Sequence, residues 1–550
     1  MSLRPPLVFK TATEDWEFEQ IHRLNYRTFV EEIPQHKASP AQRIVDKFHS
    51  ENTYLVSVCG NKLVGMLAVR GNRPFSLDQK IPNLDSFLPP GRKICEIRLL
   101  AVDKKFRGAQ VLQGILALLW QHGIERGYDL AVISGTPRQF RLYQHLGFVP
   151  FGPVVGSGEA QFQPMYVTIE TFETTAREFL RSSPSRAFHP SAVNFLPGPV
   201  TVRREVRRAF EQAPESHRGE AFHKDFESAK ASLCELVKAP KVELMLGSGT
   251  LANDVIAAQL SLEKKRGLVL SNGEFGERLI DHARRMSLQF DTLEFPWGQP
   301  LDLGAVLKML ERGVGWLWCA HCETSSGVLN DLDRLKALCS EFQVKLCLDC
   351  ISSIGTIPVD LTGVHLASGS SGKGLRAYPG LSMVFYHHVL PRGQQPLPRY
   401  LDLSFYAEQA GIPFTFSSNL LHALHAAVKR VQWDRRFADL VELSNWFRPK
   451  LRELGFDLVG DHTKTSPAVI TIALPEQFNS TKLGNMIQES GYLLSFNSEY
   501  LRRRNWIQIC LMGECTKEKL VSLLNALNRA TFRRQLKTES SPTEASHREQ

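Results

Sequence analysis

The sequence predicts an α/β protein made of two domains. Its 550 residues are more than one ordinary core accommodates. Two long segments each alternate short β-branched runs with amphipathic helical patterns, and a stretch mixing charge, Ser and Pro separates them. We therefore expect one domain over 1–173, a linker over 174–192, a second domain over 193–530 and a disordered tail over 531–550.

The first segment carries strand and helix patterns in a mixed order. The stretch 53–71 reads as two strands around a Gly-Asn-Lys turn, and 93–103 reads as a third strand. Apolar residues at helical spacing follow over 111–128, then a buried strand over 130–135 and a helix over 138–148.

The second segment repeats strand and helix more regularly. The runs "GLVLS", "GVGWLWCA" and "VKLCLD" are short and almost wholly apolar, and amphipathic helices separate them. Strands buried on both faces have this composition, so the pattern predicts a mostly parallel sheet covered by helices.

Composition narrows the possible partners and compartments. Hydrophobic residues make up 43% and charged residues 22%, as in ordinary globular proteins. The net charge of +9 is spread along the chain, which suits an anionic ligand or a solvated surface, and we expect no nucleic-acid partner. No apolar run reaches 18 residues and the N-terminus has no secretory pattern, so we expect no membrane partner and a cytoplasmic location.

Two C-x-x-C pairs raise the question of a metal site. Cys319 and Cys322 lie around a histidine, and Cys347 and Cys350 follow at a separation that a zinc ribbon accepts. On a strand, however, residues three apart point to opposite faces, so each pair lacks the turn that brings two thiolates to one zinc. We therefore expect no metal site; a zinc-ribbon binding protein is the alternative.

A glycine-rich turn indicates an anion site. In "LMLGSGTLAND" a strand leads through Gly247, Ser248, Gly249 and Thr250 into a helix. The free N–H groups and positive dipole end of a helix N-terminus bind phosphate, although many strand-to-helix turns look the same.

Two further residues favour a pyridoxal phosphate site. Asp349 ends an apolar strand, where a buried carboxylate needs a cationic partner such as a protonated pyridine nitrogen. Lys373 lies in a Gly/Ser-rich loop between two apolar strands, where its amine can serve Schiff-base chemistry. The alternative is that Asp349 caps a helix and Lys373 is a surface lysine.

Residues 193–530 resemble the class V aminotransferases of the alanine–glyoxylate, serine–pyruvate and 2-aminoethylphosphonate transaminase type. The resemblance rests on "FLPGPVTV", "SHRGEAF", "GSGTLAND", "SNGEFGERL", "HCETSSGVLN", "LDCISSIGTIPVD", "SGSSGKGLRAYPG" and "WIQICLMG", in the family's order. It implies a fold-type I pyridoxal phosphate enzyme with a large domain over about 210–410 and a small α+β domain over about 411–530 plus the N-terminal segment.

The resemblance also implies roles for individual residues. Lys373 would bind the cofactor covalently and shuttle a proton, and Asp349 would pair with the pyridine nitrogen. Gly198 would contact the substrate. Thr415 would reach the phosphate in a second copy, which implies a homodimer. The remaining cofactor contacts would be Ser248, Gly249, Thr250, Phe275, Thr324, Ser325 and Ser370.

One departure affects the substrate. The family has an arginine that binds the substrate carboxylate where this chain has Gln508, and a neutral amide cannot replace a bidentate arginine. Arg504, on the same strand face if that segment is extended, or Arg376 could compensate. Alternatively the amino donor has no carboxylate, as in 2-aminoethylphosphonate or an ω-amine.

Residues of about 8–172 resemble the GNAT superfamily of N-acetyltransferases, and more faintly its acyl-homoserine-lactone synthase and long-chain N-acyl amino acid synthase branches. The resemblance rests on "ICEIRLLAVDKKFRGAQVLQG" and "LYQHLGF". It implies a phosphate turn for acyl-CoA at Arg107 and Gly108, a general acid at Tyr143 and a general base at Glu96. Gln110 and Leu112 replace the small residues usual in this turn. An acyl carrier protein is an alternative donor, and a catalytically silent domain is the alternative to activity.

Together these patterns predict a bifunctional enzyme. We expect a pyridoxal phosphate transaminase with 2-oxo acid acceptors, joined to an N-acyltransferase that uses acetyl-CoA or another acyl-CoA. A lyase, racemase or desulfurase of the same fold is the alternative for the second domain.

Overall fold

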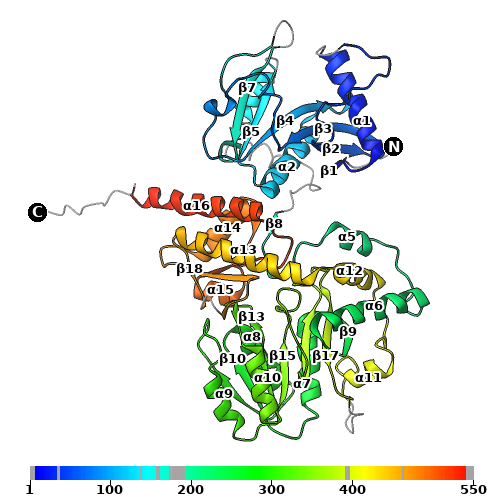
Figure 1. Cartoon of the computed structure of the whole chain (residues 1–550), viewed down its shortest axis with the longest axis vertical. Coiled ribbons are helices and arrows are strands. Elements are labelled where there is room, and N and C mark those ends of the chain that lie inside the picture. The colour runs from blue at the N-terminus through cyan, green and yellow to red at the C-terminus, as the bar shows by residue number, and fades with distance from the viewer. Residues whose placement is uncertain are drawn as a thin grey trace, which may run out of the picture. The chain divides into compact units, whose positions relative to one another are not determined.

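The computed structural model describes residues 7–33, 37–136, 139–156, 161–172, 175, 192–390, 397–460 and 464–539, of which 531–539 are described by their backbone alone. The chain divides into two compact units, Met1–Val193 with Glu518–Ala526, and Asn194–Lys517 with Leu527–Gln550 (Figure 1). Apart from 175 and 192, the expected linker lies outside the described residues. Helix α16 (Lys517–Glu539) continues past the expected domain end at 530, and 540–550 lie outside the described residues.

The first unit is built on a sheet that, over the described residues, has seven strands in the order β1-β2-β3-β4-β5-β7-β6. Neighbouring strands are antiparallel except β4 and β5, which run parallel. The β4–β5 pairing covers only Ile94–Glu96 opposite Leu130–Val132, although both strands continue beyond it. The strands are β1 (Leu7–Thr11), β2 (Thr53–Cys59), β3 (Lys62–Arg70), β4 (Ile94–Val102), β5 (Leu130–Gly135), β6 (Val149–Pro150) and β7 (Gln163–Thr168).

Helices cover both faces of this sheet, because its strands carry apolar side chains on both faces. Tyr54 and Val56 of β2 pack in one cluster with residues of α1 (Asp15–Tyr26). Leu55, between them, packs in another cluster with residues of α2 (Ala109–Arg126). Successive side chains of a strand point to opposite faces, so one apolar strand serves two helices. The strands and the first helix predicted for this segment are confirmed. The helix predicted over 138–148, running into a turn, is confirmed over α3 (Phe140–His145) with a turn at 146–147, while residue 138 lies outside the described residues.

The second unit is built on a mixed sheet in the order β11-β10-β12-β15-β16-β17-β9. The first five strands run parallel, and β17 is antiparallel to both β16 and β9, so β9 has the direction of the parallel set. The carboxyl ends of β9, β10, β12, β15 and β16 therefore meet at one edge, where ligands bind in open α/β sheets. The strands are β9 (Lys241–Gly247), β10 (Gly267–Ser271), β11 (Phe290–Glu294), β12 (Trp316–Ala320), β15 (Lys345–Asp349), β16 (Leu366–Ser370) and β17 (Gly380–Tyr386).

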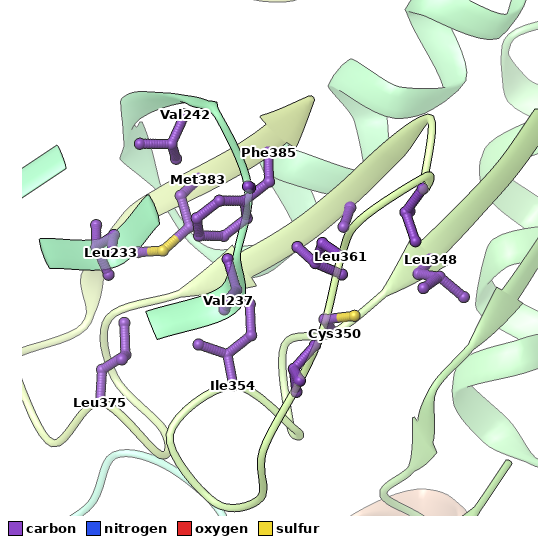
Figure 2. Close-up of a cluster of buried hydrophobic side chains, with 14 of the residues drawn as sticks. Leu233, Val237, Val242, Leu348, Cys350, Ile354, Leu361, Leu375, Met383 and Phe385 are labelled. Atoms are coloured by element: carbon purple, nitrogen blue, oxygen red, sulfur yellow. The ribbon is translucent and has the colours of Figure 1, made fainter. Parts of the chain in front are cut away.

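The core of this unit lies on one face of that sheet, under α6 (Glu220–Val237). Figure 2 shows Leu233 and Val237 of α6 close to Met383 and Phe385 of β17. Burying each such side chain contributes about 1.5–3 kcal/mol. Cys350 belongs to the same cluster, as an apolar packing residue. The other face is covered by α7 (Gly249–Leu260) and α8 (Glu274–Arg285).

A second, small sheet completes this unit. Its strands are β18 (Asp457–Leu458), β19 (Val469–Ala473) and β21 (Trp506–Cys510), all antiparallel. The main accompanying helices are α12 (Ser418–Val428), α13 (Trp433–Glu453), α14 (Ser480–Glu489) and α15 (Glu499–Arg504). The predicted fold class, a mostly parallel α/β domain with a small α+β part, is confirmed. Along the described part of the chain, no helix has the length and apolar character needed to cross a membrane.

Candidate active sites

A cavity of about 310 Å³ lies at the carboxyl edge of the large sheet. Its volume is in the range of small-molecule sites. Nine residues predicted from the sequence border it, namely Gly198, Ser248, Gly249, Thr250, Phe275, Thr324, Asp349, Ser370 and Lys373. Strand ends of the large sheet, or the turns directly after them, contribute Ser248, Asp349, Ser370 and Lys373, because parallel strands end at the same edge.

The turn from β9 into α7 forms one wall of the cavity. Ser248 is the N-cap residue of α7, and the helix begins at Gly249. A Cβ atom on Gly249 would lie 2.6 Å from Ile351 Cδ1, so any other residue here would displace the Ile351 side chain. The first N–H groups of a helix have no intrahelical partner, which makes this wall suitable for a phosphate group.

Asp349 lies at the end of β15 and is 6% exposed. Its Oδ1 accepts a hydrogen bond from the backbone N–H of Ile351 at 2.9 Å, and its Oδ2 accepts one from Asn253 Nδ2 at 2.9 Å. Within the described residues no Lys, Arg or His forms an ion pair with this carboxylate. A buried carboxylate with two neutral donors has room for a cation, which a protonated pyridine nitrogen would supply.

The amine of Lys373 lies inside the cavity. Nζ donates a hydrogen bond to Ser352 Oγ at 2.9 Å, and Ser352 Oγ also contacts Thr324 Oγ1. Burial lowers the pKa of Lys373, and the negative charge of Asp349 partly offsets this effect. A larger fraction of the amine is therefore uncharged at a given pH, as a nucleophilic lysine requires.

Phe275 borders the cavity, with its ring centroid 5.1 Å from Lys373 Nζ. Its position depends on Glu323, which is fully buried. Glu323 accepts hydrogen bonds from the backbone N–H groups of Phe275 at 3.2 Å and Gly276 at 2.9 Å. Ser325, predicted as a cofactor contact, instead donates its hydroxyl to Glu323 Oε1 at 2.5 Å and does not border the cavity.

Gln508 lies on β21 and is fully buried. Its Nε2 donates to the carbonyl oxygens of Thr324 at 2.6 Å and Ser325 at 3.0 Å, and to Thr471 Oγ1 at 2.8 Å. Its Oε1 accepts from the Tyr500 hydroxyl at 3.1 Å. The amide thus fixes the segment that carries Thr324 and is not among the residues bordering the cavity.

The two arginines proposed to compensate are used elsewhere. The expectation that Arg504 shares a strand face with Gln508 is wrong, because Arg504 ends helix α15 and Asn505 follows in the left-handed region with φ 56°. Its guanidinium lies 3.8 Å from the ring centroid of Trp297. Arg376 pairs with Glu514 at 2.6 Å. Neither borders the cavity.

The four cysteines of the C-x-x-C pairs are buried free thiols. Cys319 lies on β12 opposite Leu348, and Cys347 lies on β15 opposite Trp318. Burial raises the pKa of the Cys322 thiol to about 12. The described residues contain no group of three or more His, Cys, Asp or Glu side chains that could hold a metal ion.

The predicted residues of the first unit do not come together in the same way. Glu96 is 1% exposed and accepts hydrogen bonds from the Ser76 backbone N–H at 2.8 Å, the Ser76 hydroxyl and the Leu77 backbone N–H at 3.1 Å. Arg98 Nε lies 3.6 Å from it. Glu96 therefore anchors the segment around 76–77, whereas the sequence predicts a general base.

Tyr143, Arg107 and Gly108 occupy separate places. Tyr143 lies on α3 (Phe140–His145), donates its hydroxyl to Gln139 Oε1 at 2.8 Å, and has a pKa raised by burial. Arg107 pairs with Glu32 and donates to the Val102 carbonyl oxygen at 3.1 Å. Gly108 is the exposed N-cap residue of α2. In the described part of this unit, no hydrogen bond or ion pair joins Tyr143 to Glu96.

The structure adds residues that the sequence argument missed. Ser352, Asn253 and Arg278 each lie within a quoted motif, "LDCISSIGTIPVD", "GSGTLAND" and "SNGEFGERL" respectively. Which residues of α7 and α8 border the cavity follows only from the three-dimensional arrangement. The added residues that border the cavity include Asn253, Arg278, His282, Cys322, Ile351 and Ser352.

Comparison with known proteins identifies both parts of the chain. Residues 20–166 match the family model of the N-acyl amino acid synthase FeeM. Residues 208–398, which include the turn, Asp349 and Lys373, match that of aminotransferase class V. The chain belongs to the class V aminotransferases. It is therefore a transferase with a FeeM-like acyltransferase region at its N-terminal side.

Several relatives resemble the class V aminotransferase part. The soluble hydrogenase 42 kDa subunit of Anabaena cylindrica is 30% identical over 300 residues, which are 51% of this chain and 78% of that protein. The 2-aminoethylphosphonate–pyruvate transaminase of Pseudomonas putida is 27% identical over 249 residues, 42% of this chain and 66% of that protein. The alanine–glyoxylate aminotransferase structure from Nostoc sp. has a TM-score of 0.59 at 24% identity, covering 64% of this chain and 98% of that one, and shows the same fold.

The class V aminotransferase fold implies pyridoxal 5′-phosphate, and the cavity residues fit this cofactor. The start of α7 suits its phosphate, the carboxylate of Asp349 has no ion-pair partner among the described residues, and the amine of Lys373 borders the same cavity. The three groups differ in chemistry and match three different groups of one molecule.

Proposed function

We propose that residues 193–530 act as a transaminase that moves an amino group from a small amine or amino acid to a 2-oxo acid such as pyruvate or glyoxylate. The observation that carries the proposal is the cavity bordered together by Lys373, Asp349 and the start of α7. When bound, pyridoxal 5′-phosphate supplies an electron-accepting ring and a carbonyl carbon that takes up the amino group.

The residues around Lys373 hold and move a proton. Its lowered pKa keeps part of the amine uncharged, so Nζ can form a covalent bond and later accept a proton. Ser352 Oγ receives the Nζ hydrogen bond and so fixes the amine within the cavity. Asp349 would pair with the protonated ring nitrogen of the cofactor, and its own position is set by Ile351 and Asn253.

The amino donor in this proposal has no carboxylate at its reacting end. The amide of Gln508 is fully committed, and Arg504 and Arg376 have other partners. Arg278 borders the cavity and is exposed, and its partner is Glu274 at 2.9 Å. An exposed guanidinium can exchange such a partner for a phosphonate or another acidic group. An aminophosphonate or an ω-amine fits these observations, and the likeness to a 2-aminoethylphosphonate–pyruvate transaminase supports this choice.

The committed Gln508 also leaves a second candidate, a lyase, racemase or desulfurase that uses the same cofactor. The two candidates differ in their need for a keto acid. A purified enzyme that consumes amine in stoichiometric exchange with a 2-oxo acid is a transaminase; amine turnover that is independent of any 2-oxo acid indicates the second candidate.

We further propose a homodimer whose second copy supplies Thr415. Thr415 is exposed and does not border the cavity of its own chain. A threonine at an exposed loop can complete a phosphate site only in another chain, as the family resemblance implies.

For the first unit we propose N-acyl transfer to an amine from acyl-CoA or an acyl carrier protein, with the cytoplasm as its compartment. The raised pKa of Tyr143 keeps its phenol protonated, so it can protonate a leaving thiolate. The free cysteines agree with a reducing compartment.

One unit would then make or use the amine that the other acylates. Tyr143→Phe should lower acyl transfer by about 10²-fold or more. A catalytically silent domain would show no acyl transfer in the wild-type protein either.

The test of the transaminase proposal is a spectral titration. Enzyme with bound cofactor is mixed with amino acids, ω-amines and aminophosphonates, one at a time. A true donor converts the cofactor from its lysine-bound form to its amine form, and we expect this from an aminophosphonate or ω-amine. A cofactor spectrum that no amine changes would overturn the proposal.

A further inference from the structure

Asn253 lies on α7, one turn after the phosphate wall, and is 5% exposed. It lies in the quoted motif "GSGTLAND", beyond the residues predicted to contact the phosphate. Its side chain bridges β15 and β16, two neighbouring strands of the large sheet. Asn253 Nδ2 donates to Asp349 Oδ2 at 2.9 Å, and Ser368 Oγ donates to Asn253 Oδ1 at 2.7 Å.

The orientation of this amide is determined by its neighbours. An ionised carboxylate can only accept hydrogen bonds, so the amide must present Nδ2 to Asp349. Ser368 is fully buried and lies in register opposite Asp349 on β16. Its hydroxyl therefore meets the remaining amide oxygen and holds the side chain in this orientation.

The consequence concerns the charge of Asp349. With Asn253 on Oδ2 and the Ile351 N–H on Oδ1, each carboxylate oxygen has one donor and a fixed direction. Hydrogen bonds to the charged form of a carboxyl group keep it ionised, even where burial disfavours the charge. A chain of three buried side chains thus stabilises a negative charge at one wall of the cavity.

We propose that Asn253 is a positioning residue that aims the carboxylate of Asp349 at the ring nitrogen of pyridoxal 5′-phosphate, with Ser368 as its support. This inference rests on the proposed function, because it concerns the same cavity. Asn253 acts through Asp349: an ionised, oriented carboxylate favours the protonated ring nitrogen.

The experiment compares full-length wild type with Asn253→Ala and Asn253→Leu, both of which remove the donor. The first readout is the dissociation constant of pyridoxal 5′-phosphate, which we expect to rise about 10- to 100-fold. The second is the ¹⁵N shift of ¹⁵N-labelled cofactor against pH. The ring nitrogen should lose its proton at a pH about one unit lower in both variants than in wild type.

Asn330→Ala is the matched control. Asn330 is also a buried asparagine of this unit, donating Nδ2 to the Ala320 carbonyl oxygen at 2.9 Å, but it does not border the cavity. It should reduce thermal stability without moving the ring-nitrogen titration. Ser368→Ala keeps the donor and removes only its support, so a rise of about two- to fivefold in the dissociation constant is expected.

The outcomes distinguish a failure of the proposed function from a failure of the role of Asn253. A wild-type protein that binds no pyridoxal 5′-phosphate overturns the proposed function itself. A wild-type protein that binds it, with an unchanged ring-nitrogen titration in the Asn253 variants, overturns the role of Asn253 alone. If neither variant at 253 folds, Ser368→Ala decides, and an unchanged dissociation constant and titration there overturn the role.

Discussion

The residues predicted from motifs lie together in the class V aminotransferase cavity, whereas those of the FeeM-like unit lie apart. Around Lys373, residues from distant parts of the chain border one cavity. In the FeeM-like unit, Glu96 is tied to Ser76 and Leu77 while Tyr143 bonds to Gln139. In a parallel sheet the strand ends share an edge, so motifs at strand ends must meet. The sheet of the first unit is antiparallel apart from the short β4–β5 pairing, so its strand ends do not share one edge, and its motif residues lie apart.

The largest effect that sharpens this comparison is expected from Lys373→Ala. Without the amine, covalent attachment of the cofactor is impossible and a proton carrier is lost, so transamination should fall by at least about 10²–10⁴-fold. Absorbance spectra and initial rates measure this. Lys345→Ala is the control, since it removes a lysine of β15 that pairs with Glu263. An equal loss of transamination in that variant would contradict a catalytic role for Lys373.

Glu96→Ala should have the next largest effect, on stability. The substitution leaves the backbone N–H groups of Ser76 and Leu77 and the Ser76 hydroxyl without their acceptor, which costs about 3–5 kcal/mol in total, while Arg98 keeps its pair with Asp46. Hydrogen exchange of the peptide covering β4 in the intact chain measures the opening free energy. Glu19→Ala, which removes only an exposed ion pair, should leave this exchange unchanged. Normal exchange with abolished acyl transfer would instead make Glu96 a base.

Glu323→Gln should have a smaller effect, on the wall that carries Phe275. All recorded partners of Glu323 are donors, so the new NH₂ group must face one of them and about 1–3 kcal/mol is lost. Faster hydrogen exchange around 273–280 and weaker cofactor binding should follow. Glu277→Gln, an exposed neighbour bonded to Trp297, should change neither; equal effects from both would remove Glu323 from the account of the site.

The pH dependence of cofactor attachment gives the smallest effect. Burial lowers the pKa of Lys373 from 10.5, so the uncharged amine appears at lower pH than for a free lysine. The rate at which apoprotein binds the cofactor covalently should therefore rise with pH and reach its midpoint below 10.5. A midpoint at or above that value would show that the amine is solvated like a surface lysine.

Much of the cavity could be predicted because its residues have local signals. Gly249 is required where a Cβ would meet Ile351, and Asp349 is conspicuous as a carboxylate ending an apolar strand. Asn253 and Glu323 could not be assigned, since their roles depend on which strand ends lie opposite them. The predicted position of Arg504 on the strand face of Gln508 is wrong, because a short helix ends at Arg504 and a left-handed asparagine follows it.

Covalent labelling shows directly whether Lys373 is the lysine that binds pyridoxal 5′-phosphate. The protein loaded with pyridoxal 5′-phosphate is reduced with borohydride, digested and analysed by peptide mass spectrometry, with Lys373→Ala in parallel. We expect the cofactor mass on Lys373 in the wild-type protein and on no lysine in the variant. Stoichiometric cofactor on another lysine, with Lys373 unmodified, would contradict it.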